Sequence, residues 1–108
     1  MRLVISTCRP EEAEKIANTV VEERLTASVN MIPGGKTRVR WKGECITQDE
    51  TLLIMRTRSE LVWKLEKRIV ELNSFEIPEI ATIEIREYSA PYAEWLRDAT
   101  RQDGEIIY

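Results

Sequence analysis

The sequence predicts an α+β fold, because stretches with the spacing of strands and of helices alternate along the chain. The order is strand, helix, strand, strand, helix, strand, followed by one more helical stretch. This is the order of the split βαβ, or ferredoxin-like, arrangement. We assign residues 1–108 to a single domain, since a chain of this length with 43% hydrophobic residues is enough for one core.

The first strand and the first helix lie on either side of Pro10. Leu3–Thr7 is a compact run of apolar and β-branched residues, which is typical of a strand buried on both faces. From Pro10 to about Arg24, apolar residues recur at helical spacing. Glu11 and Glu12 place negative charge in the first turn, where it interacts favourably with the helix dipole.

The second strand is predicted to be long and bent. Residues 25–31 alternate between apolar and polar side chains, and the alternation resumes at Thr37 and continues to Trp41. The interruption at Pro33-Gly34-Gly35 therefore indicates a bulge or bend within one strand.

The return strand follows a predicted tip at Lys42-Gly43-Glu44. Its pattern is ambiguous from Cys45 to Glu50. From Thr51 to Thr57 the pattern clearly predicts a strand, because a continuous apolar run begins at Leu52. Arms of about a dozen residues at ~3.3 Å per residue reach ~40 Å, which is longer than a domain of this size requires. We therefore expect the hairpin tip to project onto a neighbouring subunit.

The second helix is predicted from Leu61 to Leu72, where apolar residues follow at helical intervals. Thr57 to Glu60 has the spacing of a capping box at its start. Pro78 precedes a fourth strand over residues 81–85, in which apolar and polar residues alternate.

A third helix is predicted after Ser89. This serine is the expected N-cap, and Pro91 lies in the first turn, where proline is well tolerated.

The predicted topology leaves one face of the sheet bare. Strand-helix-strand crossovers are right-handed, so both long helices are expected on the same face. The first and third strands are nevertheless apolar on both sides, and a bare apolar face of roughly several hundred Å² exceeds what soluble monomers usually expose. We therefore predict a closed cyclic oligomer in which each hairpin extends a neighbouring sheet.

The composition excludes some classes of site. The chain contains no histidine, which rules out a His-based catalytic triad and a His-ligated zinc site. Its two cysteines, Cys8 and Cys45, are predicted to be free thiols in a reducing cytosol. If either cysteine bound a metal ion, its thiolate would suit copper or zinc. No stretch approaches the ~18 apolar residues of a membrane span, so we expect a cytoplasmic protein without a membrane partner.

One strand face of the hairpin carries a line of four basic residues. These are Lys36, Arg38, Arg40 and Lys42. Such a line suits a polyanion, or it pairs with acidic residues across the hairpin such as Asp49 and Glu50. The formal net charge of −3 and the lack of an aromatic RNA-binding signature favour the second interpretation, so no nucleic-acid partner is expected.

The stretch from Phe75 to Ile80 is the most unusual local sequence. A phenylalanine and a proline precede a strand, and two glutamates flank the turn. It is either the lining of a small pocket or a packed connection between helix and strand.

Several segments carry a resemblance that spans nearly the whole chain: Glu23–Asn30, Ile32–Gly34, Trp41–Glu44, Arg56–Arg58, Phe75–Ile80, Tyr92 and Trp95–Leu96. In order and spacing they resemble the CutA family of divalent-cation tolerance proteins. The resemblance implies a ferredoxin-like subunit in a tight homotrimer, with the long hairpins pairing between subunits, similar in architecture to the PII signalling proteins. It also implies a non-enzymatic role in tolerance of, or response to, divalent metal ions, copper above all.

The resemblance implies a ligand-binding cleft between subunits, formed by Arg56, Phe75, Glu76, Pro78 and Glu79. The chain departs from the family pattern at Ser28, Asn73, Ser74, Phe75 and Arg56, where the family often has cysteine, histidine, proline, tyrosine and lysine. Two usual metal ligands are therefore absent, and the metal-binding residues stay unassigned, with copper or another divalent cation as the candidate ligand.

A PII-like sensor of a small anionic metabolite is the alternative function. Arg56 keeps the positive charge of the usual lysine and adds a planar donor fork that suits carboxylate or phosphate.

Overall fold

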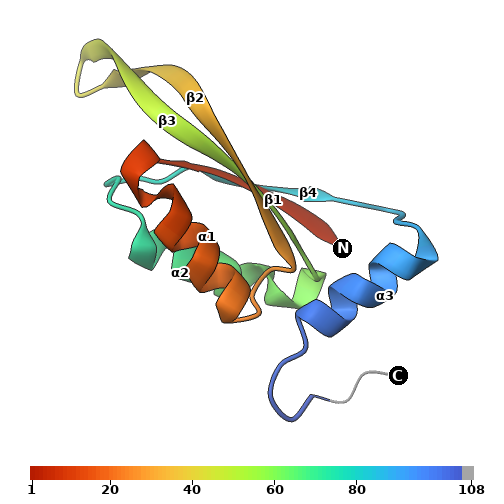
Figure 1. The fold of residues 1–108 in the computed structure, drawn as a ribbon. Helices are drawn as coiled ribbons and strands as arrows, with labels where there is room; N and C mark the ends of the chain where they lie inside the picture. The colour runs from red at the N-terminus through yellow and green to blue at the C-terminus, as the bar shows by residue number, and fades with distance from the viewer. Residues whose placement is uncertain (106–108) are drawn as a thin grey trace.

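The computed structural model describes residues 1–105 and confirms the predicted α+β fold, with two strand-helix-strand units followed by a third helix (Figure 1). The strands are β1 (Arg2–Cys8), β2 (Ser28–Trp41), β3 (Glu44–Thr57) and β4 (Ile80–Glu84). The helices are α1 (Ala13–Glu22), α2 (Val62–Leu72) and α3 (Ala90–Ala99). Two 3-10 turns, η1 (Pro10–Glu12) and η2 (Ser59–Leu61), precede α1 and α2.

The strands form one antiparallel sheet in the order β2-β3-β1-β4, and α1 and α2 lie side by side on one face of it (Figure 1). Every second residue of β1 and β3 faces these helices. Val4 lies opposite Met55 and both are completely buried. The helices complete this core with Ala13, Ile16, Val20, Leu65 and Ile69.

The opposite face of the sheet is open. Leu3, Ile5 and Ile54 are only half-buried there, and Ile32 and Ile83 are 46% and 47% exposed. The expectation that the first strand is buried on both faces is therefore wrong for the single chain. Its apolar residues do face both ways, as the sequence indicated, but the described residues leave the second side largely uncovered.

The interruption in β2 is a bulge, as predicted. The strand is continuous, and its pairing with β3 shifts between Ile32 and Gly35. Gly34 has a φ of 81°, which favours glycine, whereas Gly35 is constrained by space, because an added Cβ would lie 2.9 Å from the backbone oxygen of Glu50.

The hairpin tip is the two-residue turn Lys42-Gly43. Both residues have positive φ, 48° and 83°, which matches the twist of the flanking strands. β3 is regular from Glu44 onwards, so the stretch that was ambiguous in the sequence, Cys45 to Glu50, belongs to the strand.

The predicted capping box at Thr57–Glu60 is wrong. Thr57 still belongs to β3, where its buried hydroxyl donates to the carbonyl of Leu25 at 2.7 Å. The chain enters η2 through Arg58, which makes no side-chain cap. The first helix also ends earlier than predicted, at Glu22.

The third helix begins as predicted. The Ser89 hydroxyl accepts the backbone N–H of Tyr92 at 3.4 Å, and proline occupies the first turn. Within residues 1–105, no helix is long and apolar enough to cross a membrane.

Candidate functional site

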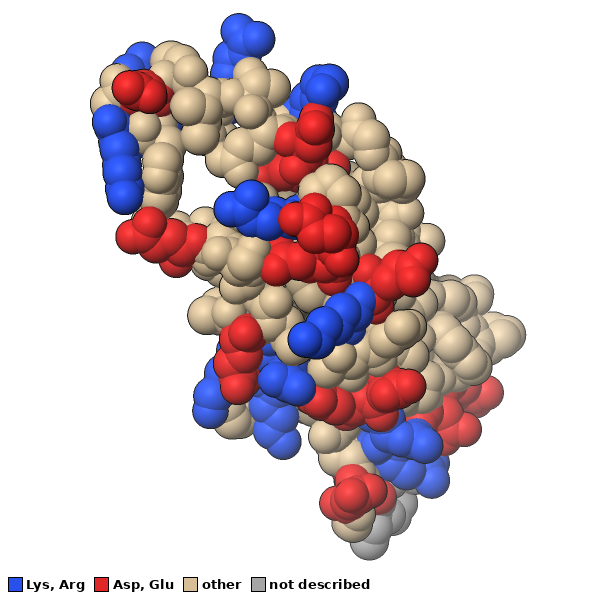
Figure 2. Space-filling model, turned by 60° about the vertical axis from the view of Figure 1, so that its left-hand side comes forward, with Lys and Arg blue, Asp and Glu red and all other residues tan. Residues whose placement is uncertain are grey.

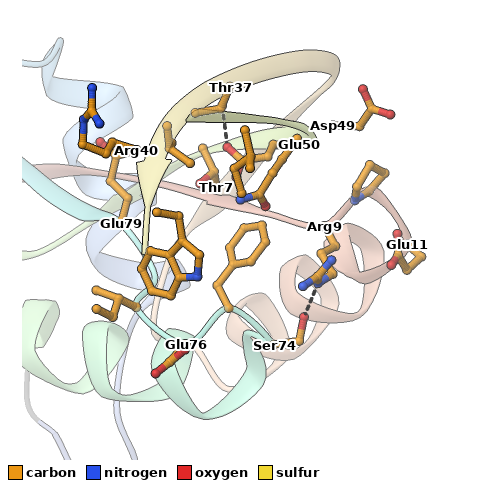
Figure 3. Close-up of a pocket in the computed structure, with 17 residues that line it drawn as sticks. Thr7, Arg9, Glu11, Thr37, Arg40, Asp49, Glu50, Ser74, Glu76 and Glu79 are labelled. Carbon is orange, nitrogen blue, oxygen red and sulfur yellow. Dashed lines mark hydrogen bonds between the residues drawn. The ribbon is translucent and has the colours of Figure 1, made fainter. Parts of the chain in front are cut away.

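The hairpin curls over η1 and over the segment between α2 and β4, and these parts enclose a cavity of about 950 Å³. Figure 2 shows the opening between the hairpin and the rest of the chain, with acidic and basic side chains around it. Three of the five predicted site residues line the cavity, namely Phe75, Glu76 and Glu79 (Figure 3).

Hydrogen bonds to β1 hold the Phe75 segment in place. The Asn73 amide donates to the carbonyl of Thr7 at 2.9 Å and accepts the backbone N–H of Phe75 at 2.9 Å. At the other end, the Ser6 hydroxyl donates to the Glu79 carbonyl at 2.6 Å. Both ends of the segment are therefore fixed to the same strand, which makes this wall of the cavity part of the fold.

Arg9 lies against the aromatic ring of this wall. Its guanidinium carbon is 5.1 Å from the centre of the Phe75 ring, and its Nε donates to the Ser74 hydroxyl at 2.9 Å (Figure 3). Ser74 in turn donates to the Glu12 carboxylate at 2.9 Å. The Arg9 side chain is therefore oriented by a cation–π contact and a hydrogen bond.

The hairpin supplies the facing wall, with Trp41 and Thr37 among its lining residues. The Thr37 hydroxyl donates to the buried Glu50 carboxylate at 2.6 Å (Figure 3). At the tip, Lys42 Nζ lies 5.8 Å from the Trp41 ring and 4.0 Å from the Glu76 carboxylate of the same chain. Both groups of that ion pair are mostly exposed, so the contact adds little stability.

The cavity lining is acidic. Its carboxylates are Glu11, Asp49, Glu50, Glu76 and Glu79, and its cations are Arg9 and Arg40. One of these acids, Asp49, pairs with Lys36 at 2.8 Å, as the paired interpretation of the basic line predicted. Among residues 1–105, no three cysteine or carboxylate side chains are grouped closely enough to hold a metal ion by themselves.

Arg56 does not reach this cavity. It lies at the far end of β3, on the open face, where it donates to the side-chain oxygen of Asn30. Ser28, its partner across the strands, has a buried hydroxyl for which residues 1–105 provide no hydrogen-bond partner, and Tyr88 lies near the guanidinium. The structure thus separates Arg56 from the Phe75 segment within one chain, and Pro78 is half-buried outside the cavity lining.

The two cysteines are free, as predicted, and differ in environment. Cys8 is completely buried, and burial together with the nearby Glu12 raises the pKa of its thiol to about 11. A neutral buried thiol is a poor metal ligand, because the thiolate is the form that binds. Cys45 is exposed on the hairpin.

Sequence reasoning missed Arg9 and Trp41 as cavity residues. The sequence offered a signal for Arg9, because this charged residue lies between an apolar strand and the proline that opens the first helix. Trp41 was assigned to the alternation of its strand and to a segment that carries the family resemblance, but its position in the cavity depends on how the hairpin curls.

Comparisons with known proteins agree with the geometry. A family model described as "CutA1 divalent ion tolerance protein" matches residues 2–99. The divalent-cation tolerance protein CutA of Thermus thermophilus is 38% identical over 98 residues, which cover 91% of this chain and 95% of that protein. Human protein CutA is 33% identical over 102 residues, which cover 94% of this chain and 57% of that longer protein.

Solved structures give the same result. The Thermus thermophilus divalent cation tolerance protein superimposes with a TM-score of 0.87 over 94% of this chain and 100% of that chain. A structure described as the PII-like protein CutA from Nostoc, in apo form, has a TM-score of 0.87 at 31% identity and covers 94% and 98% of the two chains. Sequence and fold together show that this chain belongs to the CutA family of divalent ion tolerance proteins.

Proposed function

We propose that this CutA family member is a non-enzymatic, cytoplasmic homotrimer that binds a divalent metal ion, copper in the first place, and acts in tolerance of or response to that ion. Membership of a divalent ion tolerance family supports the link to metal ions. The single observation that carries the binding site is the acidic cavity beside the Phe75 segment.

The charge of the cavity favours a cation. Five carboxylates and two guanidinium groups line it, and Lys36 and Lys42 pair with two of these carboxylates, so a small excess of negative charge remains to attract positive ions. Among divalent ions of the first transition row, Cu²⁺ binds nitrogen and oxygen ligands most strongly. Because no three ligands are grouped within the described residues, one chain supplies one or two carboxylates, and water or a second subunit supplies the rest.

The open sheet face supports the trimer. Leu3, Ile5 and Ile54 lie there in an apolar surface whose neighbours β2 and β4 are both edge strands. We propose that the neighbouring subunit covers this face and brings its Arg56 to the Phe75 segment, which would assemble the cleft that the family resemblance implies.

Titration calorimetry with Cu²⁺, Zn²⁺ and Mg²⁺ tests the metal site. We expect Cu²⁺ to bind most tightly, and we expect the double variant Glu76→Gln/Glu79→Gln to weaken it at least tenfold, while Glu14→Gln on the exposed side of α1 leaves binding unchanged. Unchanged copper affinity in the double variant, together with a loss in Cys45→Ser, would move the site from the cavity to the hairpin thiol. The absence of any binding at millimolar Cu²⁺ would contradict the proposal.

A second candidate function is a sensor of a small anion. It is favoured by the cluster around Arg56, where the buried hydroxyl of Ser28 lacks a hydrogen-bond partner in the described part of the chain and Asn30 and Tyr88 are close by. Titration with a panel of nucleotides and organic anions in the presence of a chelator tests it. Metal-independent binding that Arg56→Ala abolishes supports this candidate, and binding that survives Arg56→Ala excludes the Arg56 cluster as its site.

A further inference from the structure

Arg58 is a buried cation with a complete set of partners. It is 6% exposed and lies at the junction of β3 and η2. Its five N–H bonds are matched by five contacts, two to Thr100, two to Glu105 and a long one of 3.5 Å to the mostly exposed Glu60. A buried charge needs such compensation, because its desolvation without a partner strongly destabilises the folded state.

Thr100 fixes the orientation of the guanidinium. Arg58 donates to the Thr100 hydroxyl and carbonyl, both at 2.9 Å. Thr100 is itself completely buried at the end of α3, where its hydroxyl donates to the Leu96 carbonyl at 2.8 Å. The two contacts with Thr100 belong to the packed body of the protein. They fix the plane of the guanidinium, so the N–H groups of Nη1 and Nη2 that face Glu105 keep their direction when another acceptor replaces that carboxylate.

Glu105 supplies the other half from a short segment that follows α3. Its two oxygens accept from Arg58 Nη1 and Nη2 at 2.6 and 2.8 Å, which is the bidentate geometry of a guanidinium and a carboxylate. The Gln102 amide also holds the turn that carries Glu105 against the body of the protein, because it donates to the Arg24 carbonyl at 3.1 Å and to the Thr100 carbonyl at 2.9 Å. Asp103 and Gly104 of this turn are exposed.

A cavity of about 490 Å³ lies beside this carboxylate and is lined by the same turn together with Arg24 and Asp98. The Glu105 side chain is 28% exposed, whereas Arg58 is covered. The Glu105 carboxylate is therefore the partner that solvent reaches. Its departure would leave the N–H donors of Arg58 Nη1 and Nη2 pointing toward the cavity without this acceptor.

We propose that Arg58 and Thr100 form a carboxylate-binding site that the chain fills with its own Glu105, and that a small carboxylate from solution occupies it when Glu105 is removed or displaced. The planar pair of donors fits a carboxylate. Glu60 lies 3.5 Å from Arg58 Nη1 and disfavours a dianion such as phosphate at this guanidinium, whereas Arg24 and Arg101, which line the cavity together with Asp98, favour anions in general. Glu105 is held in place by its turn, where the backbone N–H of Gln102 also donates to its carboxylate at 2.9 Å, so solution carboxylates compete poorly with this preorganised group in the wild type.

The test is chemical rescue of Glu105→Ala, read as the free energy of unfolding in urea in sodium acetate against sodium chloride at equal ionic strength. If acetate binds with a Kd of ~10 mM, 300 mM acetate raises the folding equilibrium constant of this variant ~30-fold relative to chloride. The wild type reports the general salt effect. Asp103→Ala is the matched control, because Asp103 lies in the same turn and Arg58 makes no contact with it among the hydrogen bonds of residues 1–105.

The proposal stands if acetate stabilises Glu105→Ala at least tenfold more than it stabilises the wild type and Asp103→Ala, and if Arg58→Met/Glu105→Ala loses the response. If Glu105→Ala is unfolded in chloride, recovery of its native circular dichroism in acetate supports the proposal, and failure to recover overturns it. An equal response of all variants also overturns it. Equal stabilisation by phosphate at the same ionic strength would overturn the preference for a carboxylate.

Discussion

The Glu105 carboxylate has a pKa that hydrogen bonds from Arg58 and from the backbone of Gln102 lower from 4.5 to about 2. A pKa that is lower in the folded than in the unfolded chain contributes stability at pH values above the unfolded pKa. That contribution is lost as the pH falls through the folded value. We therefore expect the wild type to be more stable than Glu105→Gln above about pH 5, with the difference shrinking between pH 4.5 and 2.

Urea denaturation of both proteins across this pH range measures the difference. Asp103→Asn in the same turn serves as the control and should leave the pH dependence of stability as in the wild type. A constant difference between wild type and Glu105→Gln at every pH would show that the ion pair with Arg58 is not the cause.

Cys8 should be almost inert in the folded protein. Its thiol is completely buried and has a pKa of about 11, so the reactive thiolate is scarce at pH 8. In Cys45→Ser, where Cys8 is the remaining thiol, we expect alkylation by iodoacetamide to be at least ~100-fold slower than in the same variant unfolded in urea. Comparable rates in both states would contradict the buried position of Cys8 in β1.

Single residues were the part of the site that the sequence predicted least well. Phe75, Glu76 and Glu79 were identified and do meet in one cavity, because they are neighbours in the chain. The resemblance placed Arg56 with them in a cleft between subunits; within one chain it lies at the far end of β3, and the shared cleft stays a prediction. The spacing of Thr57 fitted a capping box. Thr57 lies instead on the buried side of β3, where its hydroxyl donates to the Leu25 carbonyl. Spacing along a chain predicts local neighbours and does not predict such tertiary contacts.

At the scale of elements, the bulge in β2 depends on two adjacent glycines for different reasons. Gly34 has positive φ and free space around it, whereas Gly35 lies against the backbone oxygen of Glu50. We expect Gly34→Ala to cost about 1–2 kcal/mol of stability and Gly34→Asn clearly less, since asparagine tolerates this conformation. Gly35→Ala should cost about 1–3 kcal/mol through steric overlap, and Gly35→Asn should be no better.

Free energies of unfolding of the four variants measure this difference. The comparison of asparagine with alanine at each position is the informative one, because only a conformational cause predicts a gain on going from alanine to asparagine. An equal gain at both positions would show that Gly35 is also limited by backbone conformation.

The elements themselves were predictable because their residues repeat. The alternation on either side of Pro33 identified β2 as one strand, and the helical spacing from Leu61 to Leu72 identified α2. The ends of elements were less predictable. α1 ends at Glu22, two residues before the expected Arg24, because Arg24 has a φ of 60°, a left-handed conformation that ends a helix and that its side chain does not reveal.

At the scale of the whole molecule, the open sheet face is unfavourable in a single chain, because its apolar side chains stay in contact with water. Burial of this apolar surface by a neighbour would contribute roughly 25 cal/mol per Å² removed from water. Folding and association are then coupled, so the melting temperature of the wild type should rise with protein concentration under reversible conditions. A melting temperature that stays constant across a hundredfold dilution would argue against this coupling.

Ile54→Lys tests whether that face holds the subunits together. Ile54 lies at its centre, opposite Ile5 on β1 and Asn30 on β2, and it is half-buried in the single chain. A lysine there can extend its ammonium group into solvent in a free subunit, but a covered face would bury the charge without a partner. Val70→Lys is the control, because Val70 is 53% exposed on α2.

Light scattering after size-exclusion chromatography gives the mass of each variant. We expect about three times the chain mass of 12.6 kDa for the wild type and for Val70→Lys, and a single chain mass for Ile54→Lys with its helical circular dichroism retained. Retention of the helical signal matters, because it shows that the sheet and its two helices persist when the face is exposed, and that the charge has acted on association alone. A trimeric Ile54→Lys would mean that the subunits associate through the hairpins and edge strands and that the apolar face lies outside the interface.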